Sequence, residues 1–210
     1  MSQLIGNIYI VVAPSGAGKT SLVAALLQAE PSVELSVSYS TRAARKGEID
    51  GKHYHFVERS VFDAMVERGD FLEHAEVYGN CYGTSAPWIR GRLEAGQDIL
   101  LEIDWQGAEQ VRAVFPDAIG IFIAPPSIEE LERRLRGRDT DAEEVILRRL
   151  ASARAEIDKI AEYDYIVVND DFERARQDLI SIVRAQRLKS GPQCRRLAEM
   201  FRRMGTAGAQ

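Results

Sequence analysis

The sequence predicts an α/β fold with three layers, in which a parallel β-sheet is covered by helices on both faces. Apolar runs alternate with helical patterns along most of the chain, which is typical of parallel sheets. The first apolar run is followed by a glycine-bearing turn and a helix, the context in which phosphate-binding loops occur. A polar stretch over residues 36–96 breaks the alternation and predicts a small mixed α/β module inserted into the core.

The phosphate-binding loop follows a predicted strand over Ile8–Val12 and precedes a predicted helix over Ser21–Leu27. In such a loop the backbone N–H groups and the helix N-terminus bind an anion, the lysine reaches the β- and γ-phosphates, and the threonine hydroxyl can coordinate Mg²⁺. The alternative is a glycine-rich turn with a solvated lysine. Ala13 replaces the usual first glycine, so that position must hold a conformation that alanine can adopt. The loop residues are Ala13, Pro14, Ser15, Gly16, Ala17, Gly18, Lys19 and Thr20.

The inserted stretch is expected to hold short, polar-interrupted strands and one helix before the chain returns to the core. Its predicted segments are strands over Ser36–Ser40 and His53–Val57, a helix over Val61–Glu67, and short segments near Phe71–Val77 and Tyr82–Thr84. The remaining core strands are predicted over Ile99–Ile103, Ile119–Ala124 and Tyr165–Val168. We therefore place the core at residues 1–35 and 97–189, the insertion at 36–96 and a basic tail at 190–210.

Helix signals lie between and after the later strands. Ser127 and Glu130 follow two prolines and form a capping-box pattern. Asp141 begins a long helix with apolar residues at helical spacing, and another such helix follows the last strand. The tail from Lys189 is expected to form a last helix that frays after Met204.

The composition is that of a soluble globular protein. Of the 210 residues, 45% are apolar and 28% are charged, and the net charge of −5 argues against a protein built to bind nucleic acid. Cys81 and Cys194 form no close pair, which favours a reducing compartment. The first residues lack the pattern of a signal peptide, and no apolar run is long enough to cross a bilayer. We therefore expect a cytoplasmic protein with no membrane partner.

Two acids lie at the end of the strand predicted over Ile99–Ile103. Glu102 and Asp104 are two positions apart, so both side chains point to the same side of a strand, at the carboxyl end where open α/β sheets bind ligands. Because Mg²⁺ keeps several waters and needs only one or two carboxylates nearby, these acids and Thr20 are a candidate metal site, partly through water. The alternative, compatible with the first, is that Asp104 caps a helix over Trp105–Phe115.

A basic loop follows Ser38. Arg42 and Arg45 lie three positions apart, with hydroxyl residues before them and Glu48 after them. Two such arginines can form a fork for a phosphate dianion, while Glu48 orients one of them and Tyr54 donates to the same phosphate. The alternative is a solvated basic loop, which is the commoner fate of such runs.

These motifs, taken in order, resemble the guanylate kinase family. The likeness runs from Ile8 to about Arg187, and the joint pattern is specific although each piece alone is weak. The resemblance implies transfer of the γ-phosphoryl group of ATP to GMP, giving ADP and GDP, with Mg²⁺. The matching segments are the Ser-x-Ser-Thr-Arg-x-x-Arg-x-Gly-Glu pattern of Ser38–Glu48, then Gly51–Tyr54, Phe71–Glu73, Tyr78–Thr84, Ile103–Gly107, Ala124–Ser127, Leu135–Arg138 and Val167–Asp170.

The resemblance also implies roles for individual residues. One carboxylate, that of Glu73, can accept both adjacent N–H donors of guanine, whereas adenine offers neither and would leave the buried carboxylate unpaired. Without the surrounding pattern, Glu73 reads as an ordinary exposed residue near a turn. The family positions that hold the GMP phosphate correspond to Arg42, Arg45, Tyr54 and Tyr82, and those that read the base correspond to Ser38, Glu73 and Thr84. Glu48 and Asp104 are also expected in the GMP site.

The arginine-rich stretch at about residues 136–149 resembles the lid of the family. Arg138 and Arg149 correspond to lid arginines that reach the ATP phosphates, and with Lys19 and Arg42 they form the predicted catalytic set. Asn169 corresponds to a position near adenine; the alternative is a strand-end turn residue. The other arginines form i,i+4 pairs that are typical of a solvated helix face: Glu130 with Arg134, Glu132 with Arg136, and Glu144 with Arg148.

Two other functions stay open at this level. A related phosphate-loop kinase with another acceptor, such as ribosyl bisphosphate, would keep the core and differ in the insertion. A non-catalytic guanylate-kinase-like binding module would keep the fold, but such modules usually lack the phosphate-binding loop found here. We expect ATP and GMP as partners and no nucleic acid, with the oligomeric state left open. Many family members have aspartate where this chain has Glu102, so the sequence does not decide whether Glu102 or Asp104 lies nearer to the metal.

Overall fold

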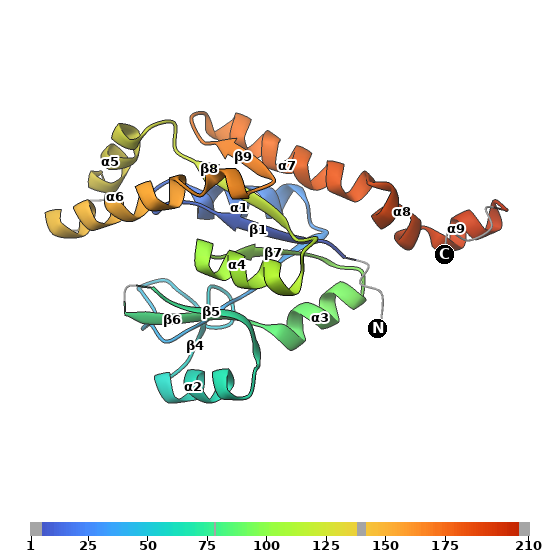
Figure 1. Cartoon of the computed structure of the whole chain (residues 1–210), viewed down its shortest axis with the longest axis horizontal. Coiled ribbons are helices and arrows are strands. Elements are labelled where there is room, and N and C mark those ends of the chain that lie inside the picture. The colour runs from blue at the N-terminus through green and yellow to red at the C-terminus, as the bar shows by residue number, and fades with distance from the viewer. Residues whose placement is uncertain (1–5, 78, 138–141, 206–210) are drawn as a thin grey trace.

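The main sheet consists of five parallel strands in the order β2-β7-β1-β8-β9 (Figure 1). The computed structural model describes residues 6–77, 79–137 and 142–205. The central strand β1 pairs on both sides, and every one of its residues is buried. The predicted α/β fold class is confirmed. The strands are β1 (Ile8–Val12), β2 (Val33–Leu35), β7 (Asp98–Glu102), β8 (Ile119–Ala124) and β9 (Tyr165–Val168).

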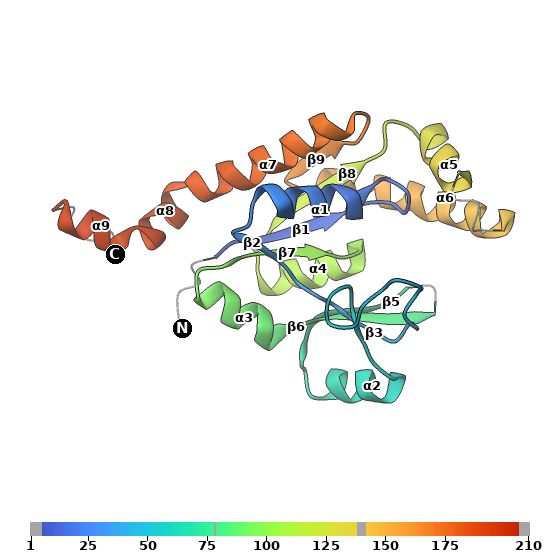
Figure 2. The same ribbon diagram turned by 180° about the vertical axis from the view of Figure 1, so that it is seen from behind.

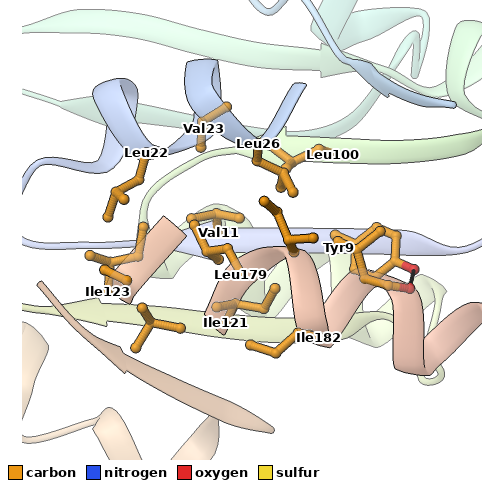
Figure 3. Packing of buried hydrophobic residues seen from close by; sticks show 14 of the residues in the cluster. Tyr9, Val11, Leu22, Val23, Leu26, Leu100, Ile121, Ile123, Leu179 and Ile182 are labelled. Atoms are coloured by element: carbon orange, nitrogen blue, oxygen red, sulfur yellow. Dashed lines mark hydrogen bonds between the residues drawn. The ribbon is translucent and has the colours of Figure 1, made fainter. Parts of the chain in front are cut away.

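Helices cover both faces of this sheet. Successive residues of β1 point to opposite faces, so the strand contributes to two separate apolar clusters. Tyr9 and Val11 belong to the cluster shared with α1 and α7, where they meet Leu26 and Leu179 (Figure 3). Ile10 belongs to the cluster shared with α3 and α4. The helices are α1 (Lys19–Ala29), α3 (Ala86–Glu94), α4 (Trp105–Val114) and α7 (Phe172–Leu188).

A second, mixed sheet has the strand order β4-β3-β6-β5 and comes from the chain between β2 and β7. β3 pairs parallel with β4, whereas β6 pairs antiparallel with both β3 and β5. This leaves β5 as an edge strand, and α4 of the main sheet lies over it (Figures 1 and 2). The elements are β3 (Tyr39–Ser40), β4 (His55–Phe56), α2 (Arg59–Glu67), β5 (Phe71–Val77) and β6 (Asn80–Ser85).

A helical arm leaves the main sheet after β8 and returns before β9. It consists of α5 (Ile128–Arg136), α6 (Glu143–Ile157) and a 3₁₀ turn η1 (Ile160–Glu162). Leu131, Leu135 and Leu150 form its own small apolar cluster. The N-terminus of α5 is capped as predicted, since the Ser127 side chain accepts a hydrogen bond from the Glu130 N–H at 3.1 Å. In Figure 1 this arm projects from the molecule at the end opposite to the C-terminus.

The C-terminal segment extends beyond the main sheet as two short helices, α8 (Ser190–Arg196) and α9 (Ala198–Arg203) (Figure 2). α8 is tied to the sheet through Asp98, a carboxylate that is 1% exposed at the start of β7. Asp98 accepts hydrogen bonds from the Asn7 N–H at 2.9 Å, from Arg187 Nε at 2.6 Å and from Arg196 Nη2 at 3.2 Å. A buried carboxylate with three such donors is held firmly in place. Among the described residues, no helix is long and apolar enough to cross a membrane.

The structure corrects several of the predicted boundaries. The strands expected over Ser36–Ser40 and His53–Val57 shorten to β3 and β4, and a single tail helix is replaced by α8 and α9. The sequence reading missed β2 and α3, and it began the long helix at Asp141, which lies outside the described residues; α6 begins at Glu143. These errors fall on short or half-exposed elements, where the hydrophobic pattern is weakest.

Candidate active site

The predicted phosphate-binding loop joins the buried end of β1 to the first turn of α1. Gly16 and Gly18 both have φ of 95°, a left-handed conformation that glycine adopts without strain. A Cβ atom on Gly18 would lie 2.3 Å from Asn169 Nδ2, so this position also needs the space that glycine leaves. Asn169, which follows β9, donates from Nδ2 to the Ala17 carbonyl at 2.7 Å. A residue 152 positions later in the sequence therefore fixes the backbone of the loop.

Lys19 and Thr20 begin α1 and contact the end of β7. Lys19 Nζ donates to the Ile103 carbonyl at 2.9 Å, and Thr20 Oγ1 donates to Glu102 Oε1 at 2.6 Å. Burial lowers the pKa of Lys19, while the nearby carboxylates of Glu102 and Glu156 act in the opposite direction. These contacts place a cation and an oxygen-rich edge side by side at the carboxyl end of the parallel strands.

Two cavities adjoin at Lys19. The larger, of about 530 Å³, lies over the phosphate-binding loop, and the smaller, of about 150 Å³, reaches the second sheet at Ser38, Glu73 and Tyr82. Ligands bound in the two cavities would therefore meet beside the lysine. The residues that line both are Lys19, Tyr54, Val77, Glu102 and Asp104.

Most residues of the predicted phosphate-binding loop face the larger cavity. It is lined by Ala13, Pro14, Ser15, Gly16, Gly18, Lys19 and Thr20. Ala17 is instead fully buried beneath the loop. A ligand in this cavity would thus lie against the backbone of the loop and the N-terminus of α1, where N–H groups and the helix dipole favour anions.

The basic loop forms an ordered fork. Arg42 donates from Nη1 to Glu48 Oε2 at 2.9 Å and from Nη2 to Glu48 Oε1 at 2.8 Å. Glu48 also accepts the Arg45 N–H at 2.6 Å, and hydrogen bonding from Arg42 lowers the pKa of Glu48 to about 2. The Arg42 guanidinium lies 5.4 Å from the centre of the Tyr54 ring, which adds a cation–π contact. The prediction that Glu48 orients one of the two arginines is confirmed for Arg42, whereas Arg45 is exposed.

Glu73 is a buried acid at the back of the smaller cavity. Its side chain is on β5, and the residue is only 4% exposed. Burial raises its pKa to about 7, and the negative charge of Asp104 adds to the rise. Thr84 lies opposite Glu73 in the β5–β6 pair and partly opposes this rise, yet its buried Oγ1 makes no hydrogen bond of normal geometry with any described residue. Glu73 therefore lines the cavity with capacity for a polar ligand, whereas Thr84 is buried beside it and does not line the cavity.

Asp104 lies between Glu102, at the end of β7, and the start of α4. Its side chain caps this helix by accepting the Gly107 N–H at 2.9 Å, so the predicted cap is confirmed. Thr20, Glu102 and Asp104 all line the larger cavity and offer the oxygen donors that Mg²⁺ prefers. The described residues contain no cluster of three or more metal-binding side chains. This donor set still fits Mg²⁺, because that ion commonly takes one or two carboxylates together with waters and substrate phosphates.

Comparison with known proteins decides the family. A family model described as guanylate kinase matches residues 5–186. The chain belongs to the guanylate kinase family. It is 90% identical over 210 residues, all of both chains, to a guanylate kinase of Chromobacterium violaceum. It is 58% identical to a guanylate kinase of Dechloromonas aromatica over 201 residues, which are 96% of this chain and 100% of the relative.

The same guanylate kinase fold is found in a solved structure. The crystal structure of guanylate kinase from Anaplasma phagocytophilum superposes with a TM-score of 0.72 at 37% sequence identity, covering 90% of this chain and 89% of that chain. The resemblance stated from the sequence motifs is thereby confirmed, together with the fold class.

The lid expected of a guanylate kinase is described only in part. Arg138 lies outside the described residues, and Arg149 is half-buried on α6. The pairs Glu130–Arg134 and Glu132–Arg136 form as predicted, with shortest N···O distances of 2.7 and 2.8 Å. Arg134 also donates from Nη2 to the Asn169 carbonyl at 3.0 Å. Arg134 therefore links α5 to the segment that holds the phosphate-binding loop, a role the helix-face pattern did not suggest.

Sequence reasoning missed several residues that line the larger cavity, chiefly Glu156 and Trp105. Burial raises the pKa of Glu156 to about 7, and its side chain accepts a hydrogen bond from Ser152 at 3.3 Å. A signal was present, since Glu156 lies three positions after Ala153 on the apolar side of α6. Lys159 Nζ lies 3.6 Å from the centre of the Trp105 ring. This contact joins residues far apart in the sequence, so no local pattern predicts it.

Proposed function

We propose that this protein is an ATP:GMP phosphotransferase that converts ATP and GMP to ADP and GDP. The observation that carries the proposal is the pair of adjoining cavities that share Lys19, one over a phosphate-binding loop and the other over Glu73. Membership of the guanylate kinase family and the 90% identity to a named guanylate kinase support the same activity.

The larger cavity would take ATP. The backbone of the loop from Ala13 to Thr20 and the N-terminus of α1 would cradle the phosphates, with Lys19 on the β- and γ-phosphates. Asn169 would act at this site by fixing the loop through the Ala17 carbonyl. The Asn169 carbonyl also accepts a hydrogen bond from Arg134. Because Asn169 corresponds to a family position near adenine, the base of ATP would lie near this residue.

The smaller cavity would take GMP. Arg42, held by Glu48, would form a bidentate contact with the phosphate, joined by Arg45 and by Tyr54 and Tyr82. Of these four residues, Tyr54 and Tyr82 line the cavity. The Glu73 carboxylate would accept the ring N–H and the amino group of guanine. The remaining proposed contacts to the base come from Ser38 and Thr84, and Asp104 lines the same cavity.

Selectivity for guanine follows from the burial of Glu73. Adenine presents an unprotonated ring nitrogen at the corresponding place and no amino group at that carbon. A buried carboxylate without a donor costs a large part of the binding free energy, so AMP would be a poor acceptor.

The chain's own groups would act on transfer by positioning and by charge. Lys19, Arg42, Arg138 and Arg149 would neutralise the charge on the moving phosphoryl group and hold donor and acceptor in line, with no covalent enzyme intermediate. Thr20, Glu102 and Asp104 would hold Mg²⁺, partly through water. When bound, Mg²⁺ supplies charge neutralisation at the phosphates. We place this activity in purine nucleotide metabolism in the cytoplasm.

The test is a coupled assay of ADP release with ATP and Mg²⁺, offering GMP, AMP, UMP and ribose bisphosphate in parallel. We expect release with GMP and little with the others. Release with ribose bisphosphate in place of GMP would keep the ATP site and reassign the second cavity. A folded protein that binds GMP but releases no ADP with any acceptor would refute the proposed activity.

A further inference from the structure

Gln110, on the second turn of α4, binds the backbone of β5 at two points. Its Oε1 accepts the His74 N–H at 3.1 Å, and its Nε2 donates to the His74 carbonyl at 2.9 Å. Nε2 also lies 3.4 Å from the Gln106 carbonyl of its own helix. The carboxamide thus uses its acceptor and its donors at once, which fixes its rotamer. Its hydrogen bonds connect α4, which covers the main sheet, to β5 of the second sheet.

The hydrogen bonds from Gln110 lie on the unpaired side of β5. β5 is an edge strand that pairs only with β6, so one side of its backbone has no strand partner. His74 presents both its N–H and its carbonyl on that side, and Gln110 occupies them as a neighbouring strand would. The residue immediately before is Glu73. Holding His74 therefore fixes the backbone position from which the Glu73 carboxylate is aimed.

Gly107 lies one turn before Gln110 on the same face of α4. A Cβ atom at Gly107 would stand 2.7 Å from Glu73 Oε2 and 3.2 Å from Glu73 Cδ. The carboxylate thus lies directly against the backbone of α4, and a side chain at this position would displace it. α4 therefore limits the position of Glu73 in two ways, by contact at Gly107 and by the hydrogen bonds of Gln110 to the adjacent residue.

We propose that Gln110 is a positioning residue that sets selectivity for the guanine base, by holding β5 against α4 so that the Glu73 carboxylate keeps its orientation. The inference rests on the proposed role of Glu73 in binding the base. A bond that only stabilised the fold would change the melting temperature but not the choice between bases. Base selectivity is therefore the readout that separates the two roles.

The experiment compares GMP with inosine monophosphate, which lacks the amino group and so offers Glu73 only one donor. Gln110→Met keeps the length of the side chain and removes every hydrogen bond. We expect the KM for GMP to rise about tenfold and the KM for ATP to stay within about twofold. The ratio of kcat/KM for GMP over inosine monophosphate should fall about fivefold or more. Gln177→Met, at an exposed position of α7, is the matched control and should keep wild-type constants.

A double-mutant cycle tests whether Gln110 acts through Glu73. If it does, Glu73→Gln with Gln110→Met loses no more selectivity than Glu73→Gln alone. Gln110→Leu, which also removes every hydrogen bond of the carboxamide, should show the same loss and replaces the methionine variant if that protein does not fold. Gly107→Ala should lower the same ratio through direct contact with the carboxylate.

The outcomes separate the inference from the proposed function. Wild-type selectivity in Gln110→Met, beside a loss in Glu73→Gln, overturns the role of Gln110 and leaves that of Glu73 intact. Wild-type selectivity in Glu73→Gln overturns both. Additive losses in the double variant show that Gln110 does not act through Glu73 and also overturn the inference.

Discussion

The free energy of unfolding of the Glu73→Gln variant, measured against that of the wild type without ligand, should be higher at pH 8 than at pH 5. Burial raises the pKa of the carboxyl from 4.5 to about 7 in the folded protein. Between these two values the folded state binds the proton and the unfolded state does not, so the free energy of unfolding falls as the pH rises. The contribution is fully present below the unfolded pKa and is lost once the pH has passed the folded pKa. Glutamine has no proton to lose, so it removes this slope.

The size of the effect follows from the shift in pKa. A shift from 4.5 to about 7 gives a loss of about 2–3 kcal/mol in the free energy of unfolding between pH 5 and pH 8. Glu156 has a pKa raised to about 7 by burial as well, so it adds a similar slope to the wild-type protein. That slope is common to both proteins, and the difference between them isolates Glu73.

Urea denaturation of both proteins at several pH values between 5 and 8, without ligand, measures this difference. We expect the glutamine variant to gain about 2–3 kcal/mol on the wild type from the lowest to the highest pH. At pH 8, GMP should stabilise the wild type more than the variant, since only the carboxylate accepts both guanine donors. If the difference in the free energy of unfolding between the two proteins stays constant from pH 5 to pH 8, the raised pKa of the Glu73 carboxyl is refuted.

Three further substitutions test the rest of the site. Lys19→Ala should lower kcat/KM by about 100-fold or more while the circular dichroism spectrum stays unchanged; near-normal turnover would count against the phosphate-binding loop. Asn169→Ala frees the Ala17 carbonyl and should raise the KM for ATP about tenfold with little change for GMP, measured by initial rates; equal changes for both substrates would contradict this. Arg42→Lys keeps the charge but loses the bidentate pairing, and should raise the KM for GMP about tenfold; an unchanged KM would remove the fork from phosphate binding.

The parts of the fold that the sequence predicted best are those set by local patterns. β1, β8 and β9 appear at their predicted bounds because each is a run of apolar residues long enough to stand out. β2 was missed because it has three residues, with the polar Glu34 in the middle, and lies at the edge of the sheet. The order of strands within the sheet came from the structure alone.

The candidate site divides in the same way. That Glu48 orients one of the two arginines was predicted because all three belong to one short loop, and the structure shows that the arginine is Arg42, six positions away. The contact of Asn169 with Ala17 and the hydrogen bonds of Gln110 to His74 join residues 152 and 36 positions apart. Glu156 likewise enters the larger cavity only through the packing of the helical arm. Local sequence spacing does not predict such contacts, because only the tertiary fold brings these residues together.

The hydrogen bond between Asn169 and Ala17 bears on when the nucleotide site is completed during protein synthesis. The ribosome makes the loop from Ala13 to Thr20 early, whereas the amide that fixes it emerges 152 positions later. By then the other four strands of the main sheet have already been synthesised, because β9 is its last strand in chain order. A nascent chain that ends before β9 therefore carries the loop sequence without the support that shapes it. The contact that orders this loop can therefore form only after every strand of the parallel sheet has been synthesised.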